Sequence, residues 1–510
     1  MSSTANRIVK NTGFLYAKMA INVFISLYTT RLILNALGAS DYGIYNVVGG
    51  VIAMLGFLNS AMTNATQRFL NYSEGQGDLF KKTVIFNNSV VLHFGISLLI
   101  AVLFLSLKPL FFGYMLNIDP ERIYAASWVY YFMIISTAFT VMNVPYDAVI
   151  NSHENMLYYA IVGLIQSLLN LAAALIITKY FGDRLILYGL FMAFISILVL
   201  IIMRIYCIKH YPECVFSPKK FVSIKSLKEQ SSFAGWNLFG SSASMINAYG
   251  SNVVMNNFFG TALNAAYGVC GQLDGQMKAL ANNLLKAVNP VITKNEGAND
   301  HLTMFKVTFS ASKLSVLLYA IMVIPFFVDC SYILKLWLKN VPPFTVVFCR
   351  LIGVKGMVEL LTLPLGTVIN ARGKIKNTSL FTGVVYYCSI MLLYLFYSLG
   401  CPPQTILLVG IAVALLVSFY QVAYCYKYCE MPLRDFLQDV LCRIIVVVLI
   451  TGIVDFTIEC LFAESFHRLL ILLTVSVFTF VCCFYFIGLT KKEQRTVRNL
   501  LANIRAKINR

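Results

Sequence analysis

The side chains best suited to bind an ion or a charged substrate lie inside long apolar stretches. The stretch 263–292 carries a row of them at steps of four, four, four and three residues: Asp274, Lys278, Asn282, Lys286 and Asn289. This spacing places the row on one face of a helix. Because a charge at the middle of a membrane costs about 3 kcal/mol on insertion scales, we expect this face to point into a cavity or against another helix.

Five further apolar stretches carry similar polar rows. The clearest members are Lys18 and Asn22 in 11–36, Asn64 and Gln67 in 42–70, and Lys355 and Glu359 in 345–371. Together with Asp274, Lys278, Asn282 and Lys286, these residues are our candidates for substrate binding. We expect the polar faces to meet in a central cleft, in which Lys and amide side chains would hold an anionic ligand.

Structural roles compete with this interpretation. Asp274 with Lys278, and Lys355 with Glu359, are spaced as (i, i+4) ion pairs that could simply stabilise their own helices. Both interpretations stay open for these pairs. Lys18 and Lys286 have no acidic residue four positions away, which favours a role in binding. Arg31 is expected to pair with Asp41, ten positions further along the chain.

The elements that carry these rows are expected to cross a membrane. The chain of 510 residues is 59% hydrophobic and 12% charged, which is far too apolar for a water-soluble core. Apolar stretches of about 20 residues, each long enough to span about 30 Å of hydrocarbon, recur from residue 11 to residue 489. The sequence therefore predicts an all-α integral membrane protein with about fourteen transmembrane helices.

Basic residues are concentrated in alternate gaps between the predicted helices. By the positive-inside rule this distribution places both termini in the cytoplasm. It also accounts for the net charge of +18 through contacts with anionic membrane lipid, so no nucleic-acid partner is needed. A basic amphipathic tail over 490–510 is expected to lie on the cytoplasmic membrane surface.

The chain contains an internal repeat. Gly38, Tyr45 and Ala65 correspond to Gly260, Tyr267 and Ala287 at a constant offset of 222, and Pro145 corresponds to Pro364 at an offset of 219. Since each half would hold an even number of spans, the halves should be parallel, an arrangement suited to alternating access. We therefore expect five segments: a six-helix lobe at 1–208, a basic cytoplasmic linker at 209–229, a second six-helix lobe at 230–428, two additional helices at 429–489, and the tail at 490–510.

The segment Arg31–Tyr45, which reads R-L-I-L-N-A-L-G-A-S-D-Y-G-I-Y, resembles the first-loop signature of the Wzx-type O-antigen and capsule flippases. These belong to the multidrug/oligosaccharidyl-lipid/polysaccharide exporter superfamily. The resemblance implies an undecaprenyl-diphosphate-linked oligosaccharide as substrate, a bacterial inner-membrane location, cationic cavity residues at Lys18, Lys278 and Lys286, and a polysaccharide polymerase as a possible partner. The second half lacks the Asp-Tyr-Gly of the signature.

Two other functions compete with this one. A multidrug antiporter of the same superfamily would need a cavity dominated by unpaired carboxylates, whereas the predicted faces carry more lysines than acids. A membrane enzyme such as a saccharide polymerase would need an acid/base pair or metal carboxylates in an ordered loop, and the external gaps are short. No phosphate-binding loop motif is present and no cofactor is expected. The sequence therefore favours a lipid-linked oligosaccharide flippase.

Overall fold

The computed structural model of the chain describes residues 2–53, 56–115, 118–338, 341–491, 493–495 and 498. Every element in these residues is helical, which confirms the predicted all-α fold. The chain divides into two compact units, and each is described by itself. We call Asn11–Ser241 the N-terminal unit, and Ser242–Arg510 together with Met1–Lys10 the C-terminal unit.

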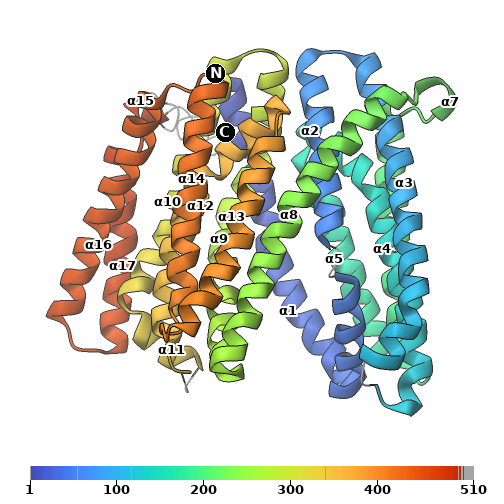
Figure 1. Cartoon of the computed structure of the whole chain (residues 1–510), viewed down its shortest axis with the longest axis horizontal. Coiled ribbons are helices and arrows are strands. Elements are labelled where there is room, and N and C mark those ends of the chain that lie inside the picture. Colours follow the sequence, from blue (N-terminus) through green and yellow to red (C-terminus); the bar gives the residue numbers. More distant parts are fainter. Residues whose placement is uncertain are drawn as a thin grey trace, which may run out of the picture. The chain divides into compact units, whose positions relative to one another are not determined.

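The helices follow one another with short connections (Figure 1). The first part of the chain forms α1 (Ser2–Ala53), α2 (Gly56–Gln76), α3 (Leu79–Leu110), α4 (Ile123–Ser152), α5 (Met156–Thr178), α6 (Arg184–His210), the short α7 (Pro218–Phe221) and α8 (Ile224–Phe259). The second part forms α9 (Thr261–Gly297), α10 (His301–Val328), α11 (Cys330–Leu338), α12 (Thr345–Arg372), α13 (Lys376–Ser398), α14 (Thr405–Cys429), α15 (Leu433–Phe436), α16 (Arg443–Leu461) and α17 (Phe466–Cys483). Single turns of other helix types lie at Phe111–Met115, Pro120–Arg122, Pro212–Cys214, Leu437–Cys442 and Phe484–Gly488.

Among the described residues, ten helices are long and apolar enough to cross a membrane. They cover ten of the predicted spans, so the chain is a multi-pass membrane protein. The remaining predicted spans coincide with α2, α8, α9 and α12, which are helical but too polar to pass the same test. Their polarity has a clear source, because α2, α9 and α12 carry most of the candidate binding residues.

The two units share unusual backbone conformations at positions that the offsets pair. Positive φ angles occur at Gly38 (77°) and Gly260 (80°), at Gly77 (70°) and Asn299 (56°), and at Glu154 (54°) and Gly373 (80°). At Gly38 and Gly260 the ψ angles are 169° and −177°, a region that only glycine occupies readily. Gly38 interrupts α1, whose last part leads to α2. Gly260 directly precedes α9. The conformations agree with the predicted repeat.

At one end of the N-terminal unit, Arg122 holds neighbouring segments together. Its guanidinium donates hydrogen bonds to both carboxylate oxygens of Asp41, at 2.8 and 2.5 Å, and to Asp183 at 2.8 Å. The predicted pairing of Arg31 with Asp41 is therefore wrong, and the side chain of Arg31 is exposed. The physical reason is the break at Gly38, which turns the chain and carries Asp41 away from the helix face of Arg31.

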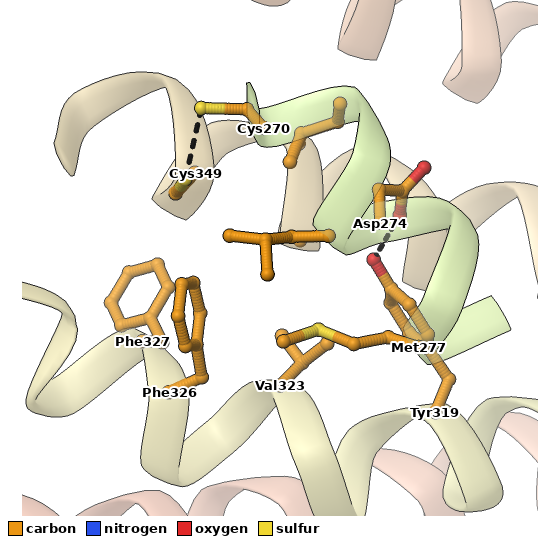
Figure 2. Close-up of a pocket in the computed structure, with 11 residues that line it drawn as sticks. Cys270, Asp274, Met277, Tyr319, Val323, Phe326, Phe327 and Cys349 are labelled. Atoms are coloured by element: carbon orange, nitrogen blue, oxygen red, sulfur yellow. Dashed lines mark hydrogen bonds between the residues drawn. The ribbon is translucent and has the colours of Figure 1, made fainter. Parts of the chain in front are cut away.

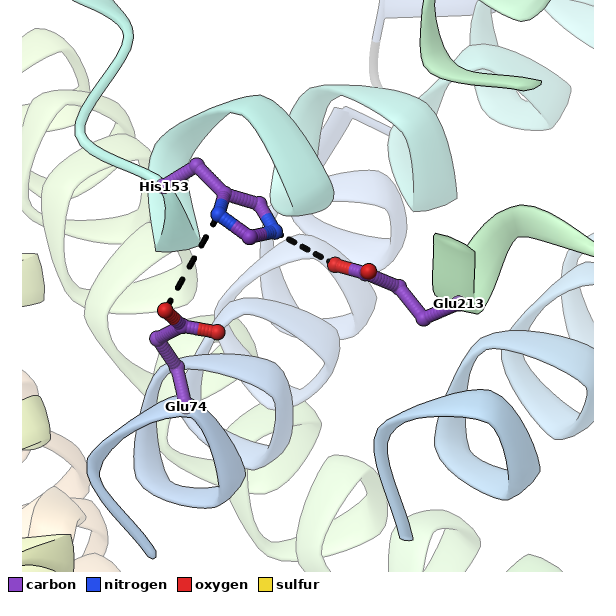
Figure 3. A group of neighbouring side chains, drawn as sticks. All are labelled: Glu74, His153 and Glu213. Atoms are coloured by element: carbon purple, nitrogen blue, oxygen red, sulfur yellow. Dashed lines mark hydrogen bonds and ion pairs between the residues drawn. The ribbon is translucent and has the colours of Figure 1, made fainter. Parts of the chain in front are cut away.

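The opposite end of this unit carries a cluster of charged side chains, Glu74, His153 and Glu213 (Figure 3). Their ligand atoms lie within 4.8 Å of one another, a set that could hold a metal ion. However, His153 Nε2 lies 2.5 Å from Glu213 Oε1, its Nδ1 lies 3.8 Å from Glu74 Oε1, and Lys82 Nζ lies 2.6 Å from Glu74 Oε2. These are hydrogen-bond and ion-pair contacts, so the cluster ties α2, α3 and α4 to the segment after α6.

The C-terminal unit has a related contact. Arg372 Nε lies 3.0 Å from Glu296 Oε1, and the offsets of 219 and 222 pair these residues with His153 and Glu74. The N-terminal unit therefore uses a titratable histidine where the C-terminal unit uses a permanently charged arginine.

This cluster predicts a loss of stability in acid. Burial would raise the pKa of Glu213, but the hydrogen bond from His153 and the charges of His153 and Lys82 hold it below the ordinary value of 4.5. A carboxyl with a lowered pKa stabilises the folded state fully above its ordinary pKa, and this contribution is lost as the pH falls through the lowered value. We expect Glu213→Gln to lower the free energy of unfolding by about 1 kcal/mol near neutral pH. We also expect the stability of this variant to change less steeply as the pH falls into the acid range.

Thermal unfolding of purified protein between pH 3 and pH 7 measures this effect. Glu121→Gln, which changes an exposed carboxylate in the turn before α4, is the matched control and should follow the wild type. If the unfolding temperature of Glu213→Gln fell with decreasing pH as steeply as that of the wild type, the prediction would be contradicted.

The C-terminal unit includes the two additional helices, α16 and α17, which pack on each other and on α10. At one end Arg468 of α17 forms a buried ion pair with Asp329, directly after α10. At the other end Lys313 of α10 bonds Glu493 at 2.6 Å. The additional helices are thus anchored to α10 at both ends. The predicted linker at 209–229 contains α7 and the start of α8, and most of the predicted tail at 490–510 lies outside the described residues.

Candidate functional site

Four charged candidates form one cluster in the C-terminal unit. Lys278 Nζ of α9 lies 2.8 Å from Asp274 Oδ2 on the same helix and 2.8 Å from Glu359 Oε2 on α12. Glu359 Oε1 in turn lies 3.4 Å from Lys355 Nζ. The two predicted (i, i+4) pairs are therefore both present, and Lys278 joins them across the two helices. Two ammonium groups balance two carboxylates in this cluster.

A tyrosine completes the cluster. The hydroxyl of Tyr319 on α10 donates a hydrogen bond of 2.5 Å to Asp274 Oδ1. This contact lies at one end of a small, mostly apolar pocket, which continues past Val323 and Phe326 towards Cys270 and Cys349 (Figure 2). Asp274 thus accepts hydrogen bonds on both oxygens, from Tyr319 and Lys278, and its carboxylate is fixed in one orientation.

The N-terminal unit has a second cluster, between α1 and α5. The ammonium group of Lys18 lies over the ring of Tyr159, 4.3 Å from its centroid. One turn along each helix, Ser167 donates a hydrogen bond of 2.9 Å to the amide oxygen of Asn22. Lys18 and Asn22, which spacing predicted to share a face, therefore both contact α5.

Gly163 makes room for the lysine. A Cβ atom at this position would lie 2.1 Å from Lys18 Nζ and 2.2 Å from its Cε. Any larger residue would push the lysine side chain away from Tyr159. The glycine on α5 is thus a condition for the observed position of Lys18.

The N-terminal cluster also includes an acid. Asp147 of α4 accepts a hydrogen bond of 3.2 Å from Asn143, one turn earlier. Both Asp147 and Lys18 lie close enough to Tyr159 to interact electrostatically with its side chain. Lys18 is thus in a polar setting that contains one carboxylate, one phenol ring and two amides.

The other candidates lie on α9, which carries part of the first cluster, and on α2. Asn282 is exposed and Lys286 is half-buried on α9, one and two turns beyond Lys278. On α2, Asn64 is exposed and Gln67 is half-buried. Lys286 adds a positive charge to the face that Asp274 and Lys278 begin.

Sequence reasoning missed four residues of these clusters: Tyr159, Gly163, Ser167 and Tyr319. A signal for the first three was present, because they follow at steps of four in an otherwise apolar helix. Tyr319 offered no such pattern. It is a single tyrosine in an apolar run, and only the packing of α10 on α9 brings it to Asp274.

Comparison with known families gives one match. A family model described as polysaccharide biosynthesis protein matches residues 8–296. No curated protein sequence matches the chain.

Solved structures of the same fold are membrane transporters. A mutant of a MATE protein superposes with a TM-score of 0.72 at 12% identity, over 85% of this chain and 97% of that one. A MOP superfamily transporter from Pyrococcus furiosus, described as having a binding pocket of reverse polarity, gives a TM-score of 0.67 at 12% identity over 85% of this chain and 96% of that one. A mutant of the Vibrio cholerae MATE transporter VcmN gives 0.67 at 15% identity over 86% and 99%. At these sequence identities, the similarity establishes a shared fold only.

Proposed function

Because this chain belongs to the polysaccharide biosynthesis protein family and has the fold of a membrane transporter, we propose that it flips a lipid-linked oligosaccharide. The substrate proposed is an undecaprenyl-diphosphate-linked oligosaccharide, carried by alternating access from the cytoplasmic to the outer leaflet for cell-surface polysaccharide assembly. The location proposed is the bacterial inner membrane, with both termini cytoplasmic. A polysaccharide polymerase is the partner that would receive the product.

The observation that carries the proposal is the presence, in each unit, of lysine ammonium groups on polar helix faces inside the spanning region. Lys18 rests on an aromatic ring, and Lys278 is shared between two carboxylates. A diphosphate can replace such contacts, since phosphate oxygens form strong charge-assisted bonds with ammonium groups. An inside-negative potential also helps an anion to move outward, by about 2.3 kcal/mol per charge per 100 mV.

The direct test measures lipid-linked saccharide on each face of the membrane. Purified protein is reconstituted in vesicles that contain a fluorescent undecaprenyl-diphosphate saccharide, and the fraction quenched from outside is followed over time. The proposal expects faster equilibration between leaflets than in empty vesicles. In cells, the gene should restore surface polysaccharide in a strain that lacks its own flippase. Absence of both effects, with normal protein levels in the membrane, would refute the proposal.

A multidrug antiporter is the second candidate, because the same fold occurs in a multidrug resistance MATE family transporter. The clusters do contain Asp147, Asp274 and Glu359, which could attract a cation. Drug resistance and drug accumulation in an efflux-deficient strain separate the two candidates. The flippase proposal expects no change in resistance to cationic drugs, together with restored surface polysaccharide.

The position of Lys18 is expected to matter as much as its charge. Gly163→Ala keeps the lysine but displaces its ammonium group from Tyr159, because the added Cβ would overlap the end of the side chain. We expect a several-fold decrease in the rate of flipping with little change in protein level. Gly13→Ala, at a position of α1 where a Cβ would meet nothing within 4 Å, is the control and should retain full activity. Equal activity of both variants would show that Lys18 need not occupy this position.

A further inference from the structure

The additional helices hold a buried carboxyl group without a compensating charge. Asp455 and Thr451 of α16 and Ser476 of α17 are all fully buried. Ser476 Oγ donates a hydrogen bond of 2.8 Å to Asp455 Oδ2. Within the described part of the chain, Asp455 Oδ1 and Thr451 Oγ1 have no hydrogen-bond partner. Two polar oxygen atoms are thus left unsatisfied in the spanning region, where each costs several kcal/mol.

The surroundings of Asp455 are apolar. Val328 of α10, Ile458 of α16 and Leu472 of α17 form a buried apolar group, against which the half-buried Val454 and Val475 pack. On α16, Val454 and Ile458 lie one and three residues from Asp455. No ion pair found among the described residues includes Asp455. An ionised carboxylate here would therefore have one hydrogen bond to offset the loss of hydration.

The charged groups on the three helices that meet here lie elsewhere or have other partners. On α17, Arg468 is eight residues from Ser476, about 12 Å along the helix, and it bonds Asp329. Lys313 of α10 and Arg443 of α16 lie at the opposite end and bond Glu493 and Asp439. Glu459 lies one turn beyond Asp455 on the same helix and would add repulsion to a second negative charge. His467 is one residue from Arg468, at the same distant end of α17.

We propose that Asp455, Thr451 and Ser476 form a proton-binding site between α16 and α17. A proton on Asp455 Oδ1 removes the buried charge and turns that oxygen into a donor. Thr451 Oγ1, four residues earlier on the same helix, makes no hydrogen bond to Asp455 in the described part of the chain. Ser476 continues to donate to Oδ2 of the protonated carboxyl. A metal cation would require about six oxygen ligands, more than these three side chains supply.

Infrared difference spectroscopy tests the site directly. Wild-type protein and Asp455→Asn, each in lipid nanodiscs at neutral pH, are compared in the region of the protonated carboxylic acid. We expect one carbonyl band that shifts in heavy water and is absent from the variant. Asp439→Asn removes a carboxylate that is paired with Arg443 at 3.3 Å, and it should leave the band unchanged. A spectrum of Asp455→Asn identical to that of the wild type would overturn the proposal.

Sodium is the alternative occupant, and the same measurement excludes or identifies it. Replacing choline with sodium at constant pH should leave the band intact, whereas loss of the band on adding sodium would show a metal cation and overturn the proposal. If Asp455→Asn does not accumulate, wild-type protein still decides the matter. A carbodiimide reacts with protonated carboxyls in apolar surroundings, so mass spectrometry should find the adduct on Asp455. Its absence at neutral pH would count against a bound proton.

Discussion

Replacing Lys278 with alanine is expected to lower both the amount of folded protein and its transport activity. The substitution leaves Asp274 and Glu359 without the ammonium group that lies 2.8 Å from each of them. Removing one partner of a buried ion pair typically costs about 3 to 5 kcal/mol. Since the Glu359 side chain is 40% exposed, we expect a smaller loss than this, about 2 to 3 kcal/mol. Thermal unfolding in detergent and quantitation in the membrane fraction measure this loss.

A charge-balanced variant separates stability from function. In Lys278→Gln with Asp274→Asn, the amide groups can still bond each other and Tyr319, and the cluster remains neutral. We expect protein level and thermal stability to return close to those of the wild type. Flipping should stay at least tenfold lower, because the ammonium group that would bind the diphosphate is still absent. Recovery of both properties would assign Lys278 a purely structural role and favour the interpretation of the row as helix-stabilising pairs.

Protein level and flipping can be measured separately for variants of Lys18 in the N-terminal cluster as well. Lys18 lies over the ring of Tyr159. A variant of Lys18 that accumulates normally and fails to flip substrate would locate part of the anion site on α1.

The chemistry of single helices could be predicted from the sequence because it depends on local spacing. Steps of four residues placed Asp274 with Lys278 and Lys355 with Glu359, and both pairs are present. The contact between the pairs could not be predicted in this way. It depends on which faces of α9 and α12 pack together, and this is set by the whole unit.

Closeness in sequence gave a wrong prediction where the backbone turns. Arg31 and Asp41 are near each other along the chain, but the left-handed conformation at Gly38 separates them, and Asp41 binds Arg122 instead. The same limit explains the missed residue Tyr319, which reaches Asp274 from a different helix. Asp455 was detectable in principle, because a lone carboxylate in an apolar stretch is a functional candidate by its cost alone.

The largest loss of stability is expected from Arg468→Ala. This arginine and Asp329 form an ion pair in which the side chains are 9% and 2% exposed, and the pair joins the start of α17 to the end of α10. Alanine would leave the Asp329 carboxylate buried and uncompensated, at a cost of about 3 to 5 kcal/mol.

The measurement is thermal unfolding, combined with limited proteolysis of the connection between α16 and α17. Lys335→Ala is the matched control, because Lys335 pairs with Glu464 over 2.9 Å but the two side chains are 56% and 42% exposed. An exposed pair of this kind contributes about 0 to 1 kcal/mol, so the control should stay close to the wild type. Adding Asp329→Asn to Arg468→Ala removes the uncompensated carboxylate of Asp329. The double variant should recover a substantial part of the lost thermal stability. If the two single variants unfold at the same temperature, the buried pair does not anchor the additional helices, and their attachment depends on the apolar contacts of α16 with α10.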